Sequence, residues 1–271
     1  MIKIATIAGS DASGGAGLEA DLKTFAEYGL YGMAAVTIIA TMDPSNNWSH
    51  AVFPIEETAL RSQLETIFKG VKPAAVKSGM LGTPYAVELT REYISEYKLK
   101  NFVLDPVMVC KGAGQPLSPE LNAAIAQKLL PLAEVATPNL FEAGQLSGLG
   151  EITSIDAMKE AAKRIAGKGA RQVFIKGGSK LPSAVRATDI FYDGKTFSIV
   201  EGDLFNTQWT HGAGCTVAAA ISSGLARGLS AGEAVTLAKK FIGSSLGAGF
   251  PLNQWVGPGN PSAWRKDRLF E

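Results

Sequence analysis

Cysteine and histidine are scarce in this sequence. Its 271 residues include two cysteines, Cys110 and Cys215, and two histidines, His50 and His211. The cysteines lie far apart in a chain without secretory features, so a structural disulfide is the weaker interpretation. We expect two free thiols.

An excess of charge of either sign is also missing. The 26 lysines and arginines nearly balance the 25 aspartates and glutamates, which leaves no electrostatic footprint for nucleic acid or for an acidic membrane surface. We therefore expect the partner to be a small molecule.

Long apolar runs and targeting signals are lacking as well. The apolar part of the N-terminal stretch MIKIATIAGSDASGG is too short to span a membrane, and the stretch has no basic region, long apolar core or cleavage site of a signal peptide. A cytoplasmic protein with no membrane partner is expected. No linker or repeat divides the chain, so residues 1–271 are predicted to form one domain.

The sequence does contain a regular alternation of apolar runs and helical spacing. Apolar runs occupy positions 2–8, 34–40, 74–77, 101–109, 133–137 and 171–176. Segments with helical spacing, such as 18–25 and 155–165, lie between them. This rhythm predicts an α/β fold in which helices cover both faces of a parallel sheet, with ligand sites at the carboxyl ends of the strands.

The last third of the chain departs from this rhythm. Residues 187–200 form two apolar runs around the turn dipeptide Asp193-Gly194, which predicts a hairpin at an antiparallel edge of the sheet. Two helices, at about 213–227 and 231–246, are expected to close the chain.

The loop after the first strand is rich in glycine. Its GAGLEA at 15–20 matches a dinucleotide-binding fingerprint, but Gly15 follows Gly9 by six positions and no acidic residue ends the second strand at the required distance. A flexible loop that a ligand can approach closely is the better interpretation, with a surface turn as the alternative.

Later strands end in side chains suited to a metal. Asp105, held out of a helix by Pro106, could bind a metal ion or serve as a turn aspartate. Asn139 and Glu142 have the spacing of a helix capping box, yet both are oxygen donors, and Mg²⁺ needs only one or two carboxylates beside water and phosphate oxygens. For Asn139 and Glu142 the two interpretations are equally supported.

Two further segments suggest phosphate binding. Lys176 could neutralise a phosphate while Gly177 and Gly178 let a nucleotide lie against the main chain, although a simple β-turn is the alternative. The segment from Cys110 to Gln115, which carries Lys111, suits a flap over a ligand.

The sequence THGAGCT at 210–216 opens one of the closing helices. Gly212, Ala213 and Gly214 allow backbone amides to converge where the helix dipole favours an anion, such as a phosphoryl group in transfer. The same position is expected to lower the pKa of Cys215 from about 8.5 toward neutrality, so that the thiol can act as a base. A small buried apolar residue is the alternative.

Taken together, the motifs resemble a known family. AGSDASGGAG, DPVMVCKG, TPNLFEAGQLSG, IKGG and HGAGCT, in this order over nearly the whole chain, are similar to those of the ribokinase superfamily, in its branch of hydroxymethylpyrimidine kinases and pyridoxine/pyridoxal kinases. The resemblance implies a three-layer α/β/α sandwich with a mostly parallel sheet that transfers the γ-phosphoryl group of MgATP to a hydroxymethyl group on a heteroaromatic ring. It also implies a homodimer. The wider superfamily has an aspartate base where this chain has Cys215, which puts a carboxylate base in doubt.

The resemblance also implies roles for individual residues. The catalytic set would be Cys215, Cys110, Gly212, Ala213, Gly214 and His211. The nucleotide would contact Asn139, Glu142, Lys176, Gly177, Gly178, Thr210 and Gly214, with Asp105 and Glu142 as the metal ligands. The substrate ring would contact Ser10, Asp11, Gly17, Met42, His50 and Met80.

The resemblance favours a vitamin B6 substrate. Pyrimidine kinases of this branch have a glutamine after the second strand, where this chain has Met42, and a thioether cannot make the same paired hydrogen bond. Cys110 and Lys111 resemble the flap of the pyridoxal kinases. We hypothesise that Cys110 adds reversibly to the aldehyde of pyridoxal as a hemithioacetal, with His211 or His50 assisting proton movement.

Two other functions stay open. One is a hydroxymethylpyrimidine kinase, and the other is a non-catalytic protein that binds a vitamin or a nucleotide on the same fold. The presence of Asp105, Glu142, Lys176 and an intact loop from Gly212 to Cys215 argues against a protein that only binds.

Overall fold

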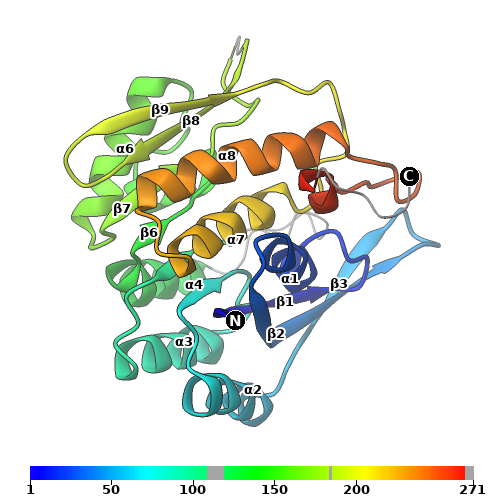
Figure 1. Ribbon diagram of the computed structural model, residues 1–271, viewed down its shortest axis with the longest axis vertical. Helices are drawn as coiled ribbons and strands as arrows, with labels where there is room; N and C mark the ends of the chain where they lie inside the picture. Colours follow the sequence, from blue (N-terminus) through cyan, green and yellow to red (C-terminus); the bar gives the residue numbers. More distant parts are fainter. Residues whose placement is uncertain (109–118, 183–184, 266–271) are drawn as a thin grey trace.

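The computed structural model describes residues 1–108, 119–182 and 185–265 of the chain. Its strands form one nine-stranded sheet (Figure 1). They are β1 (Lys3–Asp11), β2 (Tyr31–Asp43), β3 (Ser49–Pro54), β4 (Ala75–Ser78), β5 (Phe102–Leu104), β6 (Val135–Ala136), β7 (Gln172–Ile175), β8 (Ala187–Tyr192) and β9 (Phe197–Gly202).

Helices connect these strands and close the chain. They are α1 (Gly17–Glu27), α2 (Glu57–Glu65), α3 (Pro84–Glu96), α4 (Pro119–Ala124), α5 (Leu140–Ser147), α6 (Ile155–Gly167), α7 (Ala213–Ala226) and α8 (Ala231–Gly247). Turns of π-helix extend α2 and α4, at Thr66–Val71 and Ile125–Leu129, and short 3₁₀ turns lie at Leu130–Leu132 and Pro261–Trp264. Within these described ranges, no helix is both long and apolar enough to cross a membrane.

The centre of the sheet is parallel, as the apolar runs predict. The strand order is β3-β2-β1-β4-β5-β6-β7-β8-β9, and every pairing from β2 to β7 is parallel. Strands β1, β4, β5 and β6 are therefore each followed by a crossover that returns the chain to the same edge of the sheet. The loops at the carboxyl ends of β1, β4, β5, β6 and β7 consequently face one side of the molecule.

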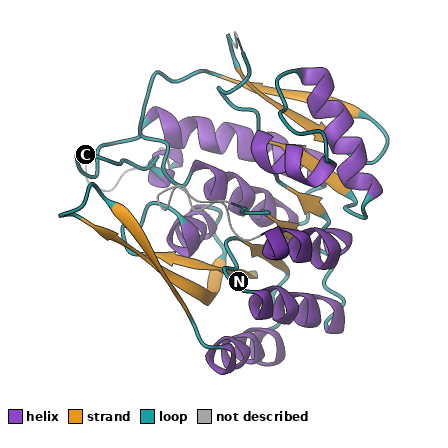
Figure 2. Ribbon diagram, turned by 180° about the vertical axis from the view of Figure 1, so that it is seen from behind, coloured by secondary structure: helices purple, strands orange, loops and turns teal. Residues whose placement is uncertain are grey.

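Helices cover both faces of the sheet, which confirms the three-layer α/β/α arrangement (Figure 2). Apolar residues of α2 to α6 form one buried cluster, with Leu60, Val87 and Ile165 among its members. Residues of α1, α7 and α8, including Phe25 and Phe241, form the other. Successive residues of a strand point to opposite faces, so each central strand contributes to both clusters.

Both edges of the sheet are antiparallel. The hairpin β8–β9 turns at Asp193-Gly194 as expected, with Tyr192 opposite Phe197. At the other edge β3 pairs with β2 in antiparallel register, and the sequence patterns did not predict this strand. Its residues are half-buried or exposed, so β3 lacks the continuous apolar run that marks the central strands.

Candidate active site

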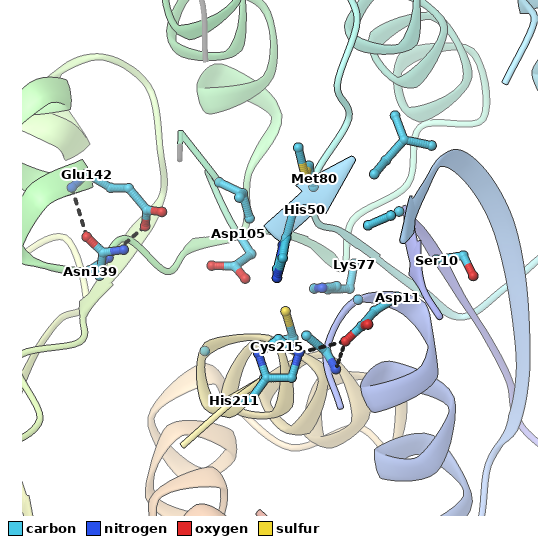
Figure 3. A pocket seen from close by; sticks show the side chains of 18 of the residues that line it. Ser10, Asp11, His50, Lys77, Met80, Asp105, Asn139, Glu142, His211 and Cys215 are labelled. Carbon is cyan, nitrogen blue, oxygen red and sulfur yellow. Dashed lines mark hydrogen bonds and ion pairs between the residues drawn. The ribbon is translucent and has the colours of Figure 1, made fainter. Parts of the chain in front are cut away.

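A pocket with a cavity volume of about 190 Å³ lies at the carboxyl ends of the parallel strands. Figure 3 shows Lys77, Asp105, His50 and Cys215 facing the same space from different elements. The described residues that line the pocket are Gly9, Ser10, Asp11, Ala16, Gly17, Ile38, Ala40, Met42, His50, Lys77, Met80, Asp105, Val107, Asn139, Glu142, Lys176, His211, Gly212, Gly214 and Cys215.

The start of α7 forms one wall of this pocket. Gly212 is its N-cap residue, with φ of 75° and no capping side chain, and a Cβ at this position would collide with the backbone of Gly15. Only glycine fits there. The amide of Ala213 donates to the carbonyl of Thr210, whereas in the described part of the chain the amides of Gly214 and Cys215 have no backbone acceptor. The anion-binding amides of this loop are therefore those of Gly214 and Cys215, while Ala213 closes the turn.

Cys215 lies in the first turn of α7 with a free thiol. Its enclosed position raises the pKa of the thiol, and the positive charge of Lys77 opposes this increase. The expected lowering of this pKa by the helix terminus is therefore wrong in direction, because loss of solvent outweighs the favourable charges. A proton-accepting role for Cys215 needs a further source of stabilisation for the thiolate.

Lys77 is a pocket residue that the motif search missed. It is fully buried at the end of β4, and its Nζ lies 2.9 Å from Oδ2 and 3.0 Å from Oδ1 of Asp21, which is also fully buried on α1. The Asp21 carboxylate also accepts a 2.6 Å hydrogen bond from Thr6 Oγ1. The sequence signal was a lysine at the end of an apolar strand and before Gly79, the same pattern that marked Lys176.

Asp105 and Lys176 form an ion pair at the centre of the sheet edge. Lys176 Nζ lies 2.6 Å from Asp105 Oδ1, and the same oxygen accepts a 3.2 Å hydrogen bond from Thr137 Oγ1. Burial opposes the charge of Lys176, but Asp105 and Glu142 raise the pKa of its ammonium group above the ordinary value. This lysine therefore stays positively charged beside the two carboxyl groups.

Asn139 and Glu142 make the capping box of α5 that their spacing predicts. The Glu142 amide donates to Asn139 Oδ1 at 3.0 Å, and the Asn139 amide donates to Glu142 Oε2 at 2.8 Å. Glu142 is also buried in the pocket wall, and this burial raises the pKa of its carboxyl group to about 7, with Lys176 opposing and Asp105 reinforcing the increase. The carboxyl group thus has a structural role while it faces the pocket.

Asp11 connects two loops of the site. Its carboxylate accepts hydrogen bonds from the amides of Ser13 and Ala16, from Ser13 Oγ, and from His211 Nε2 at 2.7 Å. Burial raises the pKa of Asp11, but the bonds from His211 and Ser13 outweigh it and hold the pKa well below its usual range. Because a carboxylate oxygen only accepts, Nε2 of His211 carries the proton in this contact.

The predicted ring contacts come together along β1, β2, β3 and the loop after β4. Met42 lies within β2, opposite His50 on β3, and not after the strand as the sequence suggested. Met80 follows β4 and lines the same wall. The Ser10 hydroxyl donates to Glu19 Oε1 at 2.6 Å, and Figure 3 shows it directed away from the centre of the pocket.

Several predicted residues lie elsewhere. Gly177, Gly178 and Thr210 are outside the lining formed by the described residues. The Gly178 amide donates to Asp189 Oδ1 at 2.8 Å, and a Cβ on Gly177 would collide with the carbonyl of Thr188, so both glycines meet needs of the turn between β7 and β8. Cys110 and the predicted flap from Cys110 to Gln115 lie outside the described residues.

These groups have a defined chemical capacity. Free amides at a helix N-terminus and two lysines can bind and stabilise an anion, and a thiol in the same turn can accept a proton if its thiolate is stabilised. Within residues 1–108, 119–182 and 185–265, no cluster of three metal-ligating side chains occurs. The arrangement therefore fits the transfer of an anionic group to a small substrate, with any cation held by few protein ligands.

Comparison with known proteins supports this assignment. A family model described as phosphomethylpyrimidine kinase matches residues 11–260. The chain is 52% identical over 265 residues to the pyridoxine kinase of Bacillus subtilis, covering 98% of this chain and 97% of that protein.

Solved structures give the same result. An ADP complex of Bacillus subtilis pyridoxal kinase is similar with a TM-score of 0.95 and 52% identity, covering 98% of this chain and 100% of that chain. The pyridoxal kinase of Staphylococcus aureus in complex with AMP-PCP and pyridoxal has a TM-score of 0.92 and 47% identity, covering 98% and 95% of the two chains.

Proposed function

Because this chain belongs to the phosphomethylpyrimidine kinase family and is a kinase of the ribokinase-like fold, we propose that it transfers the γ-phosphoryl group of ATP to the 5′-hydroxymethyl group of pyridoxal, pyridoxine or pyridoxamine. The product from pyridoxal is pyridoxal 5′-phosphate. The homodimer implied by the sequence motifs stays a prediction.

The observation that carries this proposal is the arrangement at the start of α7. The amides of Gly214 and Cys215 and the thiol of Cys215 converge on the pocket that Met42, His50 and Met80 enclose from the other side. A phosphoryl group at the amides and a ring between the hairpin and the loop after β4 would meet at this thiol. The identity of 52% to a pyridoxine kinase supports the choice of ring.

In the proposed step the Cys215 thiolate accepts the proton of the substrate hydroxyl. The hydroxyl oxygen forms a bond to the γ-phosphorus, the bond from that phosphorus to the β,γ-bridging oxygen breaks, and ADP leaves with the electron pair. The amides of Gly214 and Cys215 stabilise the charge on the transferred group. A general base contributes about 10²–10⁴-fold to such a rate, so positioning and electrostatics supply most of the remainder.

Mg²⁺ is expected from the resemblance, and the residues present fit it. Asp105 and Glu142 supply oxygen ligands in one wall, and the raised pKa of Glu142 indicates a buried carboxyl group that a cation would help to ionise. Mg²⁺ takes one or two carboxylates together with water and phosphate oxygens. When bound it would neutralise phosphate charge, and Lys176 would add a further positive charge beside it.

Phosphorylation of hydroxymethylpyrimidine is the second candidate, because the matching family model is described as phosphomethylpyrimidine kinase. Met42 argues against it. This side chain lines the pocket, and its thioether has no donor for the ring nitrogen and only a weak acceptor for the exocyclic amine of an aminopyrimidine.

A coupled assay of ADP release tests the proposal. Pyridoxal, pyridoxine and hydroxymethylpyrimidine are compared at equal concentration with MgATP. Preferred turnover of the pyridine substrates is expected. Turnover of the pyrimidine alone would replace the proposal with the hydroxymethylpyrimidine kinase activity of thiamine biosynthesis. Turnover of none of the three substrates would reject both candidate functions.

A further inference from the structure

The buried pair of Lys77 and Asp21 has no role in the steps described above. Both side chains have no exposed surface, and the pair joins β4 to α1 across a fully buried layer. Burying two charges is costly even when they pair, and such pairs often add little to stability. Two buried charges beside the pocket therefore suggest that one of them has a function in the site.

Lys77 faces the pocket, whereas Asp21 lies behind it. Lys77 is among the pocket-lining residues and Asp21 is not. Of the three ammonium protons, the contacts at 2.9 and 3.0 Å direct two to Asp21, and the described residues offer no third side-chain acceptor. A Cβ on Gly79 would lie 2.8 Å from the Lys77 Nζ, so glycine at this position leaves room for the ammonium group.

The same helix links this pair to Cys215. The amide of Gly17, the first residue of α1, donates a hydrogen bond to the Cys215 thiol, and Asp21 follows one turn later on α1. Four charged groups act on the thiol from neighbouring elements: Lys77 from β4, Asp21 from α1, Asp105 after β5 and Lys176 after β7. Both lysines are paired, Lys176 with Asp105 at 2.6 Å and Lys77 with Asp21 at 2.9 Å. Figure 3 shows the Lys77 ammonium group and the Cys215 sulfur facing the same space, and Lys77 is the positive charge that most favours the thiolate.

We propose that Lys77, fixed by Asp21, is a positioning residue whose charge favours release of the Cys215 thiol proton, so that the sulfur can accept the proton of the substrate hydroxyl. This inference rests on the proposed function for its role in turnover. Its effect on the thiol is independent of the substrate. Asp21 keeps the Lys77 ammonium group protonated and orients it, and the positive charge of Lys77 then stabilises the thiolate of Cys215.

The test is the pH dependence of Cys215 alkylation by iodoacetamide, followed by peptide-resolved mass spectrometry so that Cys110 does not interfere. The thiolate displaces iodide, so the rate reports the fraction of thiolate. We expect Lys77→Gln to move the profile to higher pH and to lower the rate at pH 8 by about tenfold, the effect of one unit of pKa. In Lys77→Ala, methylammonium is expected to restore the rate, and neutral acetamide is not.

Two further variants separate charge from packing. Lys77→Gln/Asp21→Asn replaces the ion pair with a neutral hydrogen-bonded pair, and its profile should also move to higher pH. Thr6→Val removes only the hydroxyl that supports Asp21, and its profile should match the wild type. A wild-type profile in Lys77→Gln or in the double variant would overturn the inference.

The proposed function is judged separately by wild-type turnover. A shifted alkylation profile in a protein that phosphorylates none of the three substrates would support the charge effect and reject the kinase assignment. Normal turnover by the wild type, together with an unshifted alkylation profile in Lys77→Gln, would support the kinase assignment and reject the charge effect.

Discussion

His211 Nε2 lies 2.7 Å from Asp11 Oδ2, and this contact joins the loop after β1 to the loop that begins α7. Asp11 also holds its own loop through the amides of Ser13 and Ala16. The Asp11 carboxylate therefore fixes the position of the loop after β1, which is expected to contact the substrate ring, relative to the amides at the start of α7, which are expected to bind the phosphoryl group. A small displacement of either loop would misalign the reacting atoms.

Asp11→Asn should therefore lower both stability and kcat. The pKa of Asp11 is depressed in the folded protein, so its carboxylate contributes stability above the ordinary pKa of 3.8 and loses that contribution as the pH falls below it. Urea denaturation should show a clear loss of unfolding free energy in Asp11→Asn at pH 7 and a smaller loss at pH 3, below the ordinary pKa. An equal loss at both pH values would contradict the charge-based role.

The sequence predicted most of the site because parallel strands deliver their loops to one edge. Five residues were predicted for the site because each follows a strand or begins a helix, and all five line the pocket: Asp105, Asn139, Glu142, Lys176 and Gly214. Local rules sufficed for these positions, as they did for the capping box of α5.

What the sequence could not show were partners far apart along the chain. The role of Lys77 depends on its contact with Asp21, 56 positions away, and the role of Asp11 depends on its contact with His211, 200 positions away. The direction of the Cys215 pKa was mispredicted for the same reason, since the helix terminus is a local feature and burial is a property of the whole fold. Edge strand β3 was missed because it is half-exposed and has no central-strand pattern.

Asn139→Ala separates the structural role of the capping box from a role in the site. Loss of an N-cap side chain costs about 1 kcal/mol. Ser230→Ala is a matched control, because Ser230 and Glu233 form the same motif at the start of α8. Both variants should lose similar unfolding free energy in urea, while only Asn139→Ala should raise the KM for ATP. Equal kinetics in both variants would leave Asn139 with a capping role alone.

Glu142→Gln should alter the pH dependence of stability. Burial raises the pKa of Glu142 from 4.5 to about 7. As the pH rises from 4.5 to about 7, the carboxyl group ionises more readily in the unfolded chain than in the folded protein, so the wild type loses stability over this range. In metal-free buffer the unfolding free energy of Glu142→Gln, relative to wild type, should therefore increase between pH 5 and pH 8. A difference that does not change with pH would contradict the raised pKa.

Cys215→Ala should lower kcat by about 10²–10⁴-fold, the contribution of a positioned general base. The KM for ATP should change little, because the variant keeps the backbone amides of Gly214 and residue 215. Steady-state kinetics at saturating pyridoxine are the measurement. Cys215→Ser serves as the control for size, and recovery of wild-type kcat by this weaker base would count against a thiolate that takes the proton.

Met42→Gln should shift the choice of ring. Met42 lies in β2 opposite His50, with its side chain at the pocket, and glutamine has nearly the same length with a donor and an acceptor at its end. One net hydrogen bond contributes about 1 kcal/mol, so kcat/KM for hydroxymethylpyrimidine relative to pyridoxal should rise about fivefold. Ile39→Gln is the control on the same strand, because Ile39 is an exposed residue opposite Phe53 and its substitution should leave the ratio unchanged. If Met42→Gln also leaves the ratio unchanged while the protein remains folded, the choice of ring does not depend on the polarity of this wall, and the remaining pocket residues of β1 and the loop after β4 must supply it.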